Sequence, residues 1–288
     1  MDATAVVRRA VANRFAADAI HQPEQFALHK QDERHNITQK IVETAQGDVA
    51  LLVAVNGVAL SAQGRQAERA RLDLLNEHPE YQEHRRKREE ADTGRMNSLL
   101  RLLPDAFLYQ YEDTEACNVT TGPTVAVPGL AQPAAASPAA LSQCYRMSFK
   151  PNPTWDPPNI EAKILRGMAG EIWIEKSSER LHKLNAQLVE DVDFGWGILG
   201  RLYKGGKFII VQRDVGGGHW EEVQETLQFN GKILMVKPLT IWSTETMTDF
   251  RPVSSDLTVA QALDLLHKSN DVVAQNADTV NEAQNNHK

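Results

Sequence analysis

The segment from residue 161 to 250 constrains the fold most, because strand-like stretches follow one another there with very short links. The links read SSE (177–179), KGG (204–206), GGG (216–218) and NG (230–231). Links of two to four residues that carry Gly or Asn-Gly join antiparallel neighbours, since parallel strands need crossovers of a dozen or more residues. The sequence therefore predicts a meander of about six or seven antiparallel strands.

The predicted strands of this meander are EAKILRG (161–167), GEIWIEK (170–176), RLHKLNAQLV (180–189), GRLYK (200–204), KFIIVQRDV (207–215), HWEEVQETLQF (219–229) and KILMVKPLTIWSTETMTDF (232–250). In residues 219–229 apolar and polar side chains alternate, which predicts one dry face and one wet face. The dry set is Val223, Leu227 and Phe229, and the wet set includes Glu222. Both faces of KILMV are apolar, so we expect that stretch to be covered on both sides.

The first part of the chain mixes helices and strands. Residues 3–20 predict a helix, because Val7, Val11 and Phe15 recur at a spacing of four. Strands are predicted at 26–33, 37–47 and 48–57, with a turn at Asn56–Gly57. Residues 62–103 form a helical insertion that Pro104 closes, and its charged run at 83–92 predicts a solvated face with ion pairs between residues four apart. Further strands are predicted at 105–113 and 144–151.

The end of the chain predicts one more helix and a tail. TVAQALDLLHK (258–268) carries an apolar stripe, with Ser255 or Asp256 as its N-cap. Residues 269–288 are polar and rich in Asn and Gln, which is typical of disorder. We therefore expect a single domain over residues 1–268, with the helical insertion 62–103, a low-complexity loop rich in Pro and Ala at 118–143, and a disordered tail.

The stretch GWGILG (195–200) matches the G-x-G-x-x-G pattern of dinucleotide-binding loops. Such a loop needs a helix that opens at its last glycine, so that free N–H groups face a pyrophosphate. Here a β-patterned stretch follows Gly200 instead. The sequence therefore indicates a tight corner or bulge between strands and no dinucleotide cofactor.

No pattern in the sequence indicates catalysis or a metal site. The formal net charge of −7 argues against a general nucleic-acid binder. Asp191 and Asp193 share one face of a strand and could bind a cation or serve a hydrolase, but no third ligand lies nearby, so turn-forming and solubility roles are favoured. The histidines are scattered and form no ligand motif. We expect a protein that is not an enzyme and has no cofactor and no bound metal.

Two cysteines, Cys117 and Cys144, border the low-complexity loop. If the flanking strands form a hairpin, the two thiols could bond; otherwise they are unrelated free thiols. A bond would imply an oxidising compartment. No apolar run of about 18 residues predicts a membrane-spanning helix, and the first 15 residues lack the apolar core of a signal peptide. An export leader, if there is one, would have been removed before this numbering begins.

The segment GMAGEIWIEKSSERLHKLNAQLV (167–189) resembles the outer-membrane lipoprotein-sorting superfamily of LolA-, LolB- and RseB-like proteins. The similarity lies in a strand with a central Trp between hydrophobic residues and a following Glu, then a short turn and a basic–hydrophobic strand. Residues 190–208 and 248–266 also resemble uncharacterised envelope proteins of the Acidobacteria type. The long helical insertion and the Pro/Ala loop depart from the superfamily pattern.

The resemblance implies an α+β fold: an antiparallel, strongly curved open β-barrel or half-barrel with helices packed on its concave face. It also implies a periplasmic or secreted, non-catalytic protein that binds a lipid, an acyl chain, another apolar small molecule or a lipoprotein. The expected ligand-binding side chains are Ile172, Ile174, Leu184, Leu188, Ile209, Val211, Val223 and Leu227. A register slip of one residue would swap this set for its neighbours. The alternative is an interaction or scaffold protein whose cavity is filled by its own helices.

Overall fold

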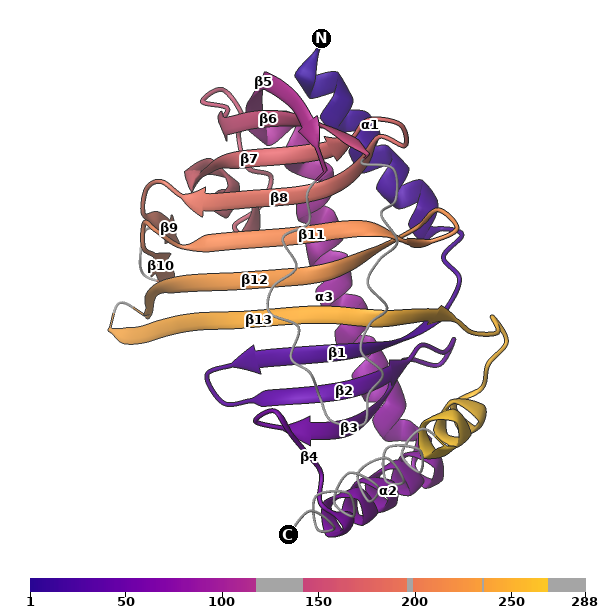
Figure 1. Cartoon of the computed structure of the whole chain (residues 1–288). Coiled ribbons are helices and arrows are strands. Elements are labelled where there is room, and N and C mark those ends of the chain that lie inside the picture. The colour runs from indigo at the N-terminus through magenta and orange to yellow at the C-terminus, as the bar shows by residue number, and fades with distance from the viewer. Residues whose placement is uncertain (118–141, 196–198, 235, 269–288) are drawn as a thin grey trace, which may run out of the picture. The chain divides into compact units, whose positions relative to one another are not determined.

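The computed structural model describes residues 1–117, 142–195, 199–234 and 236–268 (Figure 1). The predicted low-complexity loop at 118–143, except for its last two residues, lies outside the described residues. The predicted tail at 269–288 and Trp196 also lie outside them.

The protein is an α+β structure whose strands form one antiparallel sheet of 13 strands. The strand order is β4-β3-β2-β1-β13-β12-β11-β8-β7-β6-β5, with β10 paired to β12 and β9 paired to β10. The order begins at β4 and ends at β5, so the sheet is open and not closed into a barrel. The prediction of an antiparallel α+β fold is confirmed, whereas its strong curvature stays a prediction.

The chain divides into two compact units. Unit 1 comprises Met1–His21, Thr93–Thr120 and Pro138–Glu245, and unit 2 comprises Gln22–Asp92, Thr121–Ser137 and Thr246–Lys288. The single domain expected over residues 1–268 stays a prediction. One helix and one strand each contribute residues to both units.

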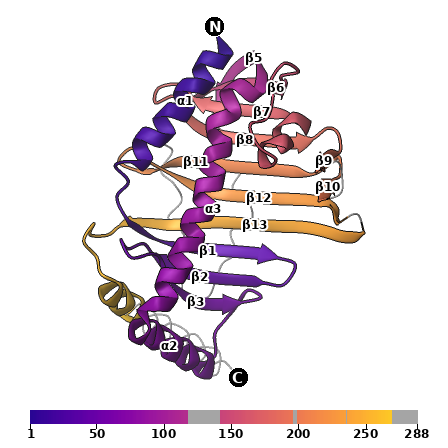
Figure 2. The ribbon, with the colours of Figure 1, turned by 180° about the vertical axis from the view of Figure 1, so that it is seen from behind.

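Unit 1 holds the predicted meander. Its elements are α1 (Ala3–Asp18), the second half of α3 (Pro79–Ala106), β5 (Phe107–Ala116), β6 (Gln143–Pro151), η1 (Glu161–Gly167), β7 (Met168–Glu175), β8 (Arg180–Leu188), β9 (Val192–Phe194), β10 (Gly200–Leu202), β11 (Lys207–Gly216), β12 (His219–Ile233) and the first part of β13 (Lys237–Pro252). Val7 of α1 and Leu103 of α3 pack with Ile172 and Leu184 of the strands in one hydrophobic core. Both helices therefore cover the same face of this part of the sheet (Figure 2).

Unit 2 is a smaller sandwich of strands and helices. Its elements are β1 (Glu24–Asp32), β2 (Asn36–Val42), β3 (Val49–Val55), β4 (Val58–Ala59), α2 (Ala62–Glu77), the first half of α3, the end of β13 and a helix at 259–268. Val42, Leu51, Leu72 and Leu263 meet in its core, with Leu72 fully buried. The ion pairs expected in the charged run are present, for example Arg85–Glu89 at 2.8 Å.

Two predicted boundaries around the helices were wrong. Pro104 does not end the helical block, because α3 continues to Ala106. A proline near the last turn removes only one backbone donor, which the short remainder of the helix tolerates. Residues 161–167 were predicted as a strand but form the 3-10 helix η1, in which the side chain of Asn159 accepts a hydrogen bond from the backbone N–H of Ala162 at 2.8 Å.

The turn predicted at Asn230–Gly231 was also wrong. Strand β12 runs through both residues to Ile233, and Gly231 pairs with Leu202 of β10. A Cβ on Gly231 would overlap the carbonyl oxygen of Arg201, so the glycine serves a close backbone approach and not a turn. The chain reverses after Ile233, where Leu234 is 64% exposed, so the expected two-sided cover of KILMV is contradicted.

The N-cap of the last helix is Thr258 and not Ser255 or Asp256. The Thr258 hydroxyl accepts from the backbone N–H of Gln261 at 3.3 Å, and the Gln261 side chain accepts from the backbone N–H of Thr258 at 2.9 Å. This reciprocal pair is a capping box, in which two orphan donors of the first turn are satisfied at once.

Candidate ligand-binding site

Two pockets lie side by side in unit 1 where α3 crosses the sheet. Three residues of α3, namely Met96, Leu100 and Leu103, line both of them. The first, here called the apolar pocket, has a volume of about 140 Å³. Its wall is hydrophobic and comprises Met96, Leu99, Leu100, Leu103, Phe107, Tyr109, Phe149, Ile164, Leu165, Met168, Leu184, Ala186, Phe208, Leu227 and Phe229. The one hydroxyl in this wall, that of Tyr109, is engaged by donating to the carbonyl oxygen of Leu103 at 2.9 Å.

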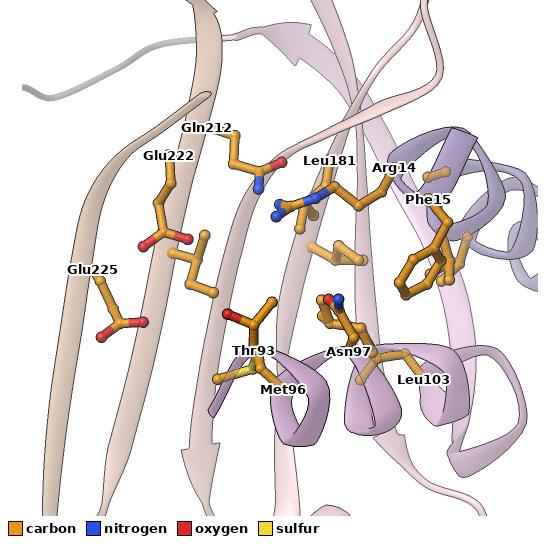
Figure 3. A pocket seen from close by; sticks show the side chains of 16 residues that line it. Arg14, Phe15, Thr93, Met96, Asn97, Leu103, Leu181, Gln212, Glu222 and Glu225 are labelled. Atoms are coloured by element: carbon orange, nitrogen blue, oxygen red, sulfur yellow. The ribbon is translucent and has the colours of Figure 1, made fainter. Parts of the chain in front are cut away.

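The second, here called the glutamate pocket, has a volume of about 180 Å³ and lies between α1, α3 and the strands (Figure 3). Its apolar wall includes Val7, Phe15, Leu181 and Ile210, and its polar side chains are Arg14, Thr93, Asn97, Gln212, Glu222 and Glu225. Each of these pockets is smaller than the usual ligand site of about 300–1,000 Å³. A small group therefore fits each of them without movement of α3.

The strand register explains which side chains reach the pockets. Leu184 of β8 lies opposite both Ile172 of β7 and Ile210 of β11. Directly opposed residues in an antiparallel pair point to the same face. One apolar row thus crosses three strands beneath the helices, and each second residue along a strand joins it.

The predicted ligand-binding residues divide between the two faces. Ile172 lines the glutamate pocket, and Leu184 and Leu227 line the apolar pocket. Ile174 and Leu188 are fully buried in the core of unit 1. The structure brings these five residues together on the helix-covered side.

Ile209 and Val211 lie on the wrong face for this site. Their cross-strand partners on β8 are Asn185 and Lys183, whereas Phe208 and Ile210 supply the pocket walls. The period of two was predicted correctly on β11, but its phase was off by one residue. Val223 is buried but lines neither pocket, because it is the extra residue of a bulge.

Because of this bulge, Glu222, which was predicted to lie on the wet face, lies in the wall of the glutamate pocket. Val211 pairs with Gln224 and the next residue, Gln212, pairs with Glu222, so Val223 has no partner of its own. Beyond the bulge the alternation of β12 is reversed, and Glu222 joins Glu225 in the pocket wall. The alternation of HWEEVQETLQF has two breaks around this shift: Glu221 and Glu222 are consecutive polar residues, and Glu225 falls in the same set of alternate positions as Val223.

Glu222 has an unusual electrostatic environment. Burial raises the pKa of its carboxyl to about 8, and the neighbouring Glu225 adds to the shift, while Arg14 opposes it. Among the described residues no hydrogen bond or ion pair reaches the side-chain carboxyl of Glu222. A carboxyl group with this pKa is mostly protonated at neutral pH and can donate a hydrogen bond into the pocket.

Arg14, in contrast, is already engaged. Its Nε donates to the two carboxylate oxygens of Asp18 at 3.0 and 3.2 Å. Gln212, which is 4% exposed, accepts from the Arg14 guanidinium and donates to the carbonyl oxygen of Leu181 at 3.1 Å, in the amide orientation that satisfies both groups. Figure 3 shows the guanidinium extending toward the Gln212 amide.

Asp191 and Asp193 were considered above as a cation site or a hydrolase site, and Arg201 forms ion pairs with both carboxylates. Asp193 accepts from Arg201 at 2.6 and 2.8 Å, and this hydrogen bonding lowers the pKa of Asp193. Asp191 accepts from the backbone N–H of Lys204 at 2.8 Å. Within the described residues, no cluster of three or more His, Cys, Asp or Glu side chains could hold a metal ion. These contacts agree with the turn-forming role that was favoured.

The position of Gly200 also agrees with the predicted corner between strands. Gly200 starts strand β10, which pairs antiparallel with β9 and β12. No helix starts there, so the dinucleotide motif is excluded. Gly195, at φ 58°, turns the chain before this corner, and the residues between Gly195 and Leu199 lie outside the described part.

The two cysteines are bonded. Cys117 and Cys144 form a disulfide across the β5–β6 hairpin, which confirms the first of the two alternatives. Trp173 lies on the face opposite the pockets, where its indole N–H donates to Glu115 at 2.6 Å and Lys183 lies over its ring. Trp155, Trp173, Trp220 and Trp242 line neither pocket.

The helices in the described ranges are all too short or too polar to span a membrane. No family model matches this chain, and no curated protein matches it significantly in sequence.

Proposed function

We propose that unit 1 binds the apolar group of a lipid or another small amphiphile, and that this binding involves no catalysis. The observation that carries the proposal is the apolar pocket, whose wall is hydrophobic and whose single hydroxyl is already bonded. An open antiparallel sheet is also one feature of the curved half-barrel that the resemblance to the lipoprotein-sorting superfamily implies.

The volume of the apolar pocket sets what it could hold. A cavity of about 150 Å³ lined by Leu, Ile and Phe stays dry and takes a group of benzene size, and the pocket has about 140 Å³. Each buried methylene contributes about 0.8 kcal/mol, so the last four or so carbons of a chain would contribute about 3 kcal/mol. A longer chain would extend into the glutamate pocket past Met96 and Leu100, which line both spaces.

The disulfide supports a location outside the cytoplasm. Disulfides form and persist in oxidising compartments, and Cys117 is bonded to Cys144. We therefore place the proposed binding activity in the periplasm or in the secreted fraction. Detection of this bond in protein isolated from its native compartment, with free thiols blocked at lysis, would test that placement.

Native mass spectrometry of the purified protein tests the binding itself. We expect a co-purifying lipid or amphiphile that dissociates on collisional activation. The Ala186→Phe variant would fill the apolar pocket, because Ala186 is 2% exposed and lines it. We expect that variant to lose the bound species.

Gln187→Phe is the matched control, since the next residue of β8 points to the opposite face and is exposed. It should retain the ligand. Thermal unfolding of both variants checks that they fold. A ligand that stays bound to Ala186→Phe as tightly as to the wild type would refute the apolar pocket as the binding site.

A second candidate function has one specific observation in its favour. Residues Met96–Leu103 of α3 lie against the sheet of unit 1, and the two pockets that they line are small. A scaffold protein whose own helix fills the cavity would show the same small pockets. Leu99→Ala and Leu100→Ala discriminate the two: emptier pockets should bind hydrophobic probes more tightly in a ligand carrier, whereas a scaffold should only lose stability.

A further inference from the structure

We infer that the glutamate pocket takes the ammonium head of an amphiphilic primary amine, with Glu222 as its counter-ion and the apolar wall around its stem. This inference rests on the proposed function, because it names the ligand class of the same site. It adds the sign of the charge that the site selects.

The first step of the argument is the contrast between the two charged residues that face each other across the pocket. Arg14 is engaged by Asp18 and Gln212. The side-chain carboxyl of Glu222 makes no hydrogen bond or ion pair within the described residues. A ligand anion would meet an arginine whose charge is already paired with Asp18, whereas a ligand cation would meet a carboxyl group with no ion-pair partner among the described residues.

The second step concerns the acids around Glu222. Glu225 also lines the pocket, and Glu245 and Glu221 act on Glu222 in the same direction, against Arg14 alone. Like charges raise the energy of the ionised carboxylate, and a bound cation removes this repulsion. An ammonium group has three donors and no acceptor, so it can serve a carboxylate together with neighbouring oxygens such as those of Thr93 and Asn97.

The third step is the shape of the wall. Val7, Leu100, Ile172 and Ile210 give the pocket a hydrophobic lining next to Glu222. A free metal ion or a small hydrated cation gains nothing from such a lining, whereas an alkyl stem gains about 0.8 kcal/mol for each buried methylene. A carboxyl group without an ion-pair partner in the described part of the chain, next to an apolar wall, therefore fits an alkylammonium group.

The proton balance gives this inference a distinctive signature. With a pKa of about 8, Glu222 is about nine-tenths protonated at pH 7. Binding of an ammonium ion favours the ionised carboxylate, so about 0.9 proton leaves Glu222 for solution with each amine bound. The affinity should therefore rise close to tenfold per pH unit from about pH 5.5 to 7.5 and level off above about pH 8.

Isothermal titration calorimetry with n-hexylammonium, n-hexanol and n-hexanoate tests the inference at a constant stem length. We expect hexylammonium to bind at least about tenfold more tightly than hexanol, and hexanoate to bind most weakly. Titrations in phosphate and in Tris, whose ionisation heats differ, count the released protons.

Glu222→Gln should bring hexylammonium down to the affinity of hexanol and abolish proton release. Glu221→Gln is the control, because it removes the same charge one residue away and outside the pocket wall. The proton count on the wild type gives an answer even if Glu222→Gln does not fold.

The outcomes separate this inference from the proposed function. Binding of hexanol with no preference for the amine, or an amine preference that survives in Glu222→Gln, would overturn the inference alone. Failure of all three compounds to bind, together with no co-purifying amphiphile, would overturn the proposed function as well.

Discussion

Replacing Glu222 by Gln should change the pH dependence of stability in a defined direction. The folded state raises the pKa of Glu222 to about 8, while an unfolded chain has a Glu pKa of about 4.3. Between these values the native state holds one more proton than the unfolded state, so the free energy of unfolding falls by up to about 1.4 kcal/mol per pH unit as pH rises. The stability that this group contributes is present at low pH and is lost toward pH 8.

The whole interval would amount to about 5 kcal/mol, which is an upper limit. Glu222 is only partly shielded from solvent, so we expect screening to reduce the effect to about 2–3 kcal/mol. Glutamine cannot ionise. Glu222→Gln should therefore differ little from the wild type at pH 5 and be more stable by that amount at pH 8.

Urea unfolding at pH 5, 6, 7, 8 and 9 measures the difference directly, because other titrating groups cancel between variant and wild type. Asp264→Asn, which removes an exposed carboxylate from the last helix, is the control and should show a nearly constant difference. A stability difference between Glu222→Gln and the wild type that stays constant between pH 5 and 8 would mean that burial does not raise the pKa of Glu222 in the folded state. That result would refute the reasoning.

Three further predictions concern stability and can be measured by chemical or thermal unfolding. Gly231→Ala should destabilise unit 1 by about 2 kcal/mol or more, because the new Cβ would overlap the Arg201 carbonyl oxygen. Gly94→Ala is the control and should stabilise the protein by about 0.5–1 kcal/mol, because nothing lies within 4 Å of the new Cβ. Equal effects of the two substitutions would contradict the close approach at Gly231. Replacing both Cys117 and Cys144 by Ala should cost about 3.5 kcal/mol, as expected for a bond across 27 residues, and reductant should then have no further effect on the variant. Leu72→Ala should cost about 2–5 kcal/mol, because Leu72 is fully buried in the core of unit 2; a loss below about 1 kcal/mol would show that the core is loosely packed.

Most of the fold in unit 1 was predictable because its determinants are local. Gly205 and Gly216 to Gly218 adopt positive φ at the predicted reversals, where residues other than glycine are strained. Strand-like stretches between short links identified β8 and β11, and the alternation over residues 219–229 identified most of β12. The helix over 3–20 was also predicted nearly to its ends, since α1 spans Ala3–Asp18 and starts at an Asp2 N-cap.

The candidate site was only half predictable. Leu184 and Leu227 were identified from their patterns, but Ile209 was chosen where Ile210 lines the pocket. Glu222 was placed on the wet face, because a strict alternation was assumed over residues 219–229 and the bulge at Val223 reverses it. Asn230–Gly231 has the letters of a turn, yet its strand continues because β10 approaches Gly231 too closely for a side chain.

The sequence alone determined the class of the structure: antiparallel strands, where most of the chain reversals occur, and which residues alternate. These features depend on backbone preferences and on the period of two, which act within a few residues of one another. Only the tertiary structure decided which half of each alternation faces the helices, and that choice placed an acid beside an apolar wall. The physical reason is that a shift of one residue leaves the local pattern unchanged but exchanges the two faces of a strand, so only the packing of distant elements can select between them.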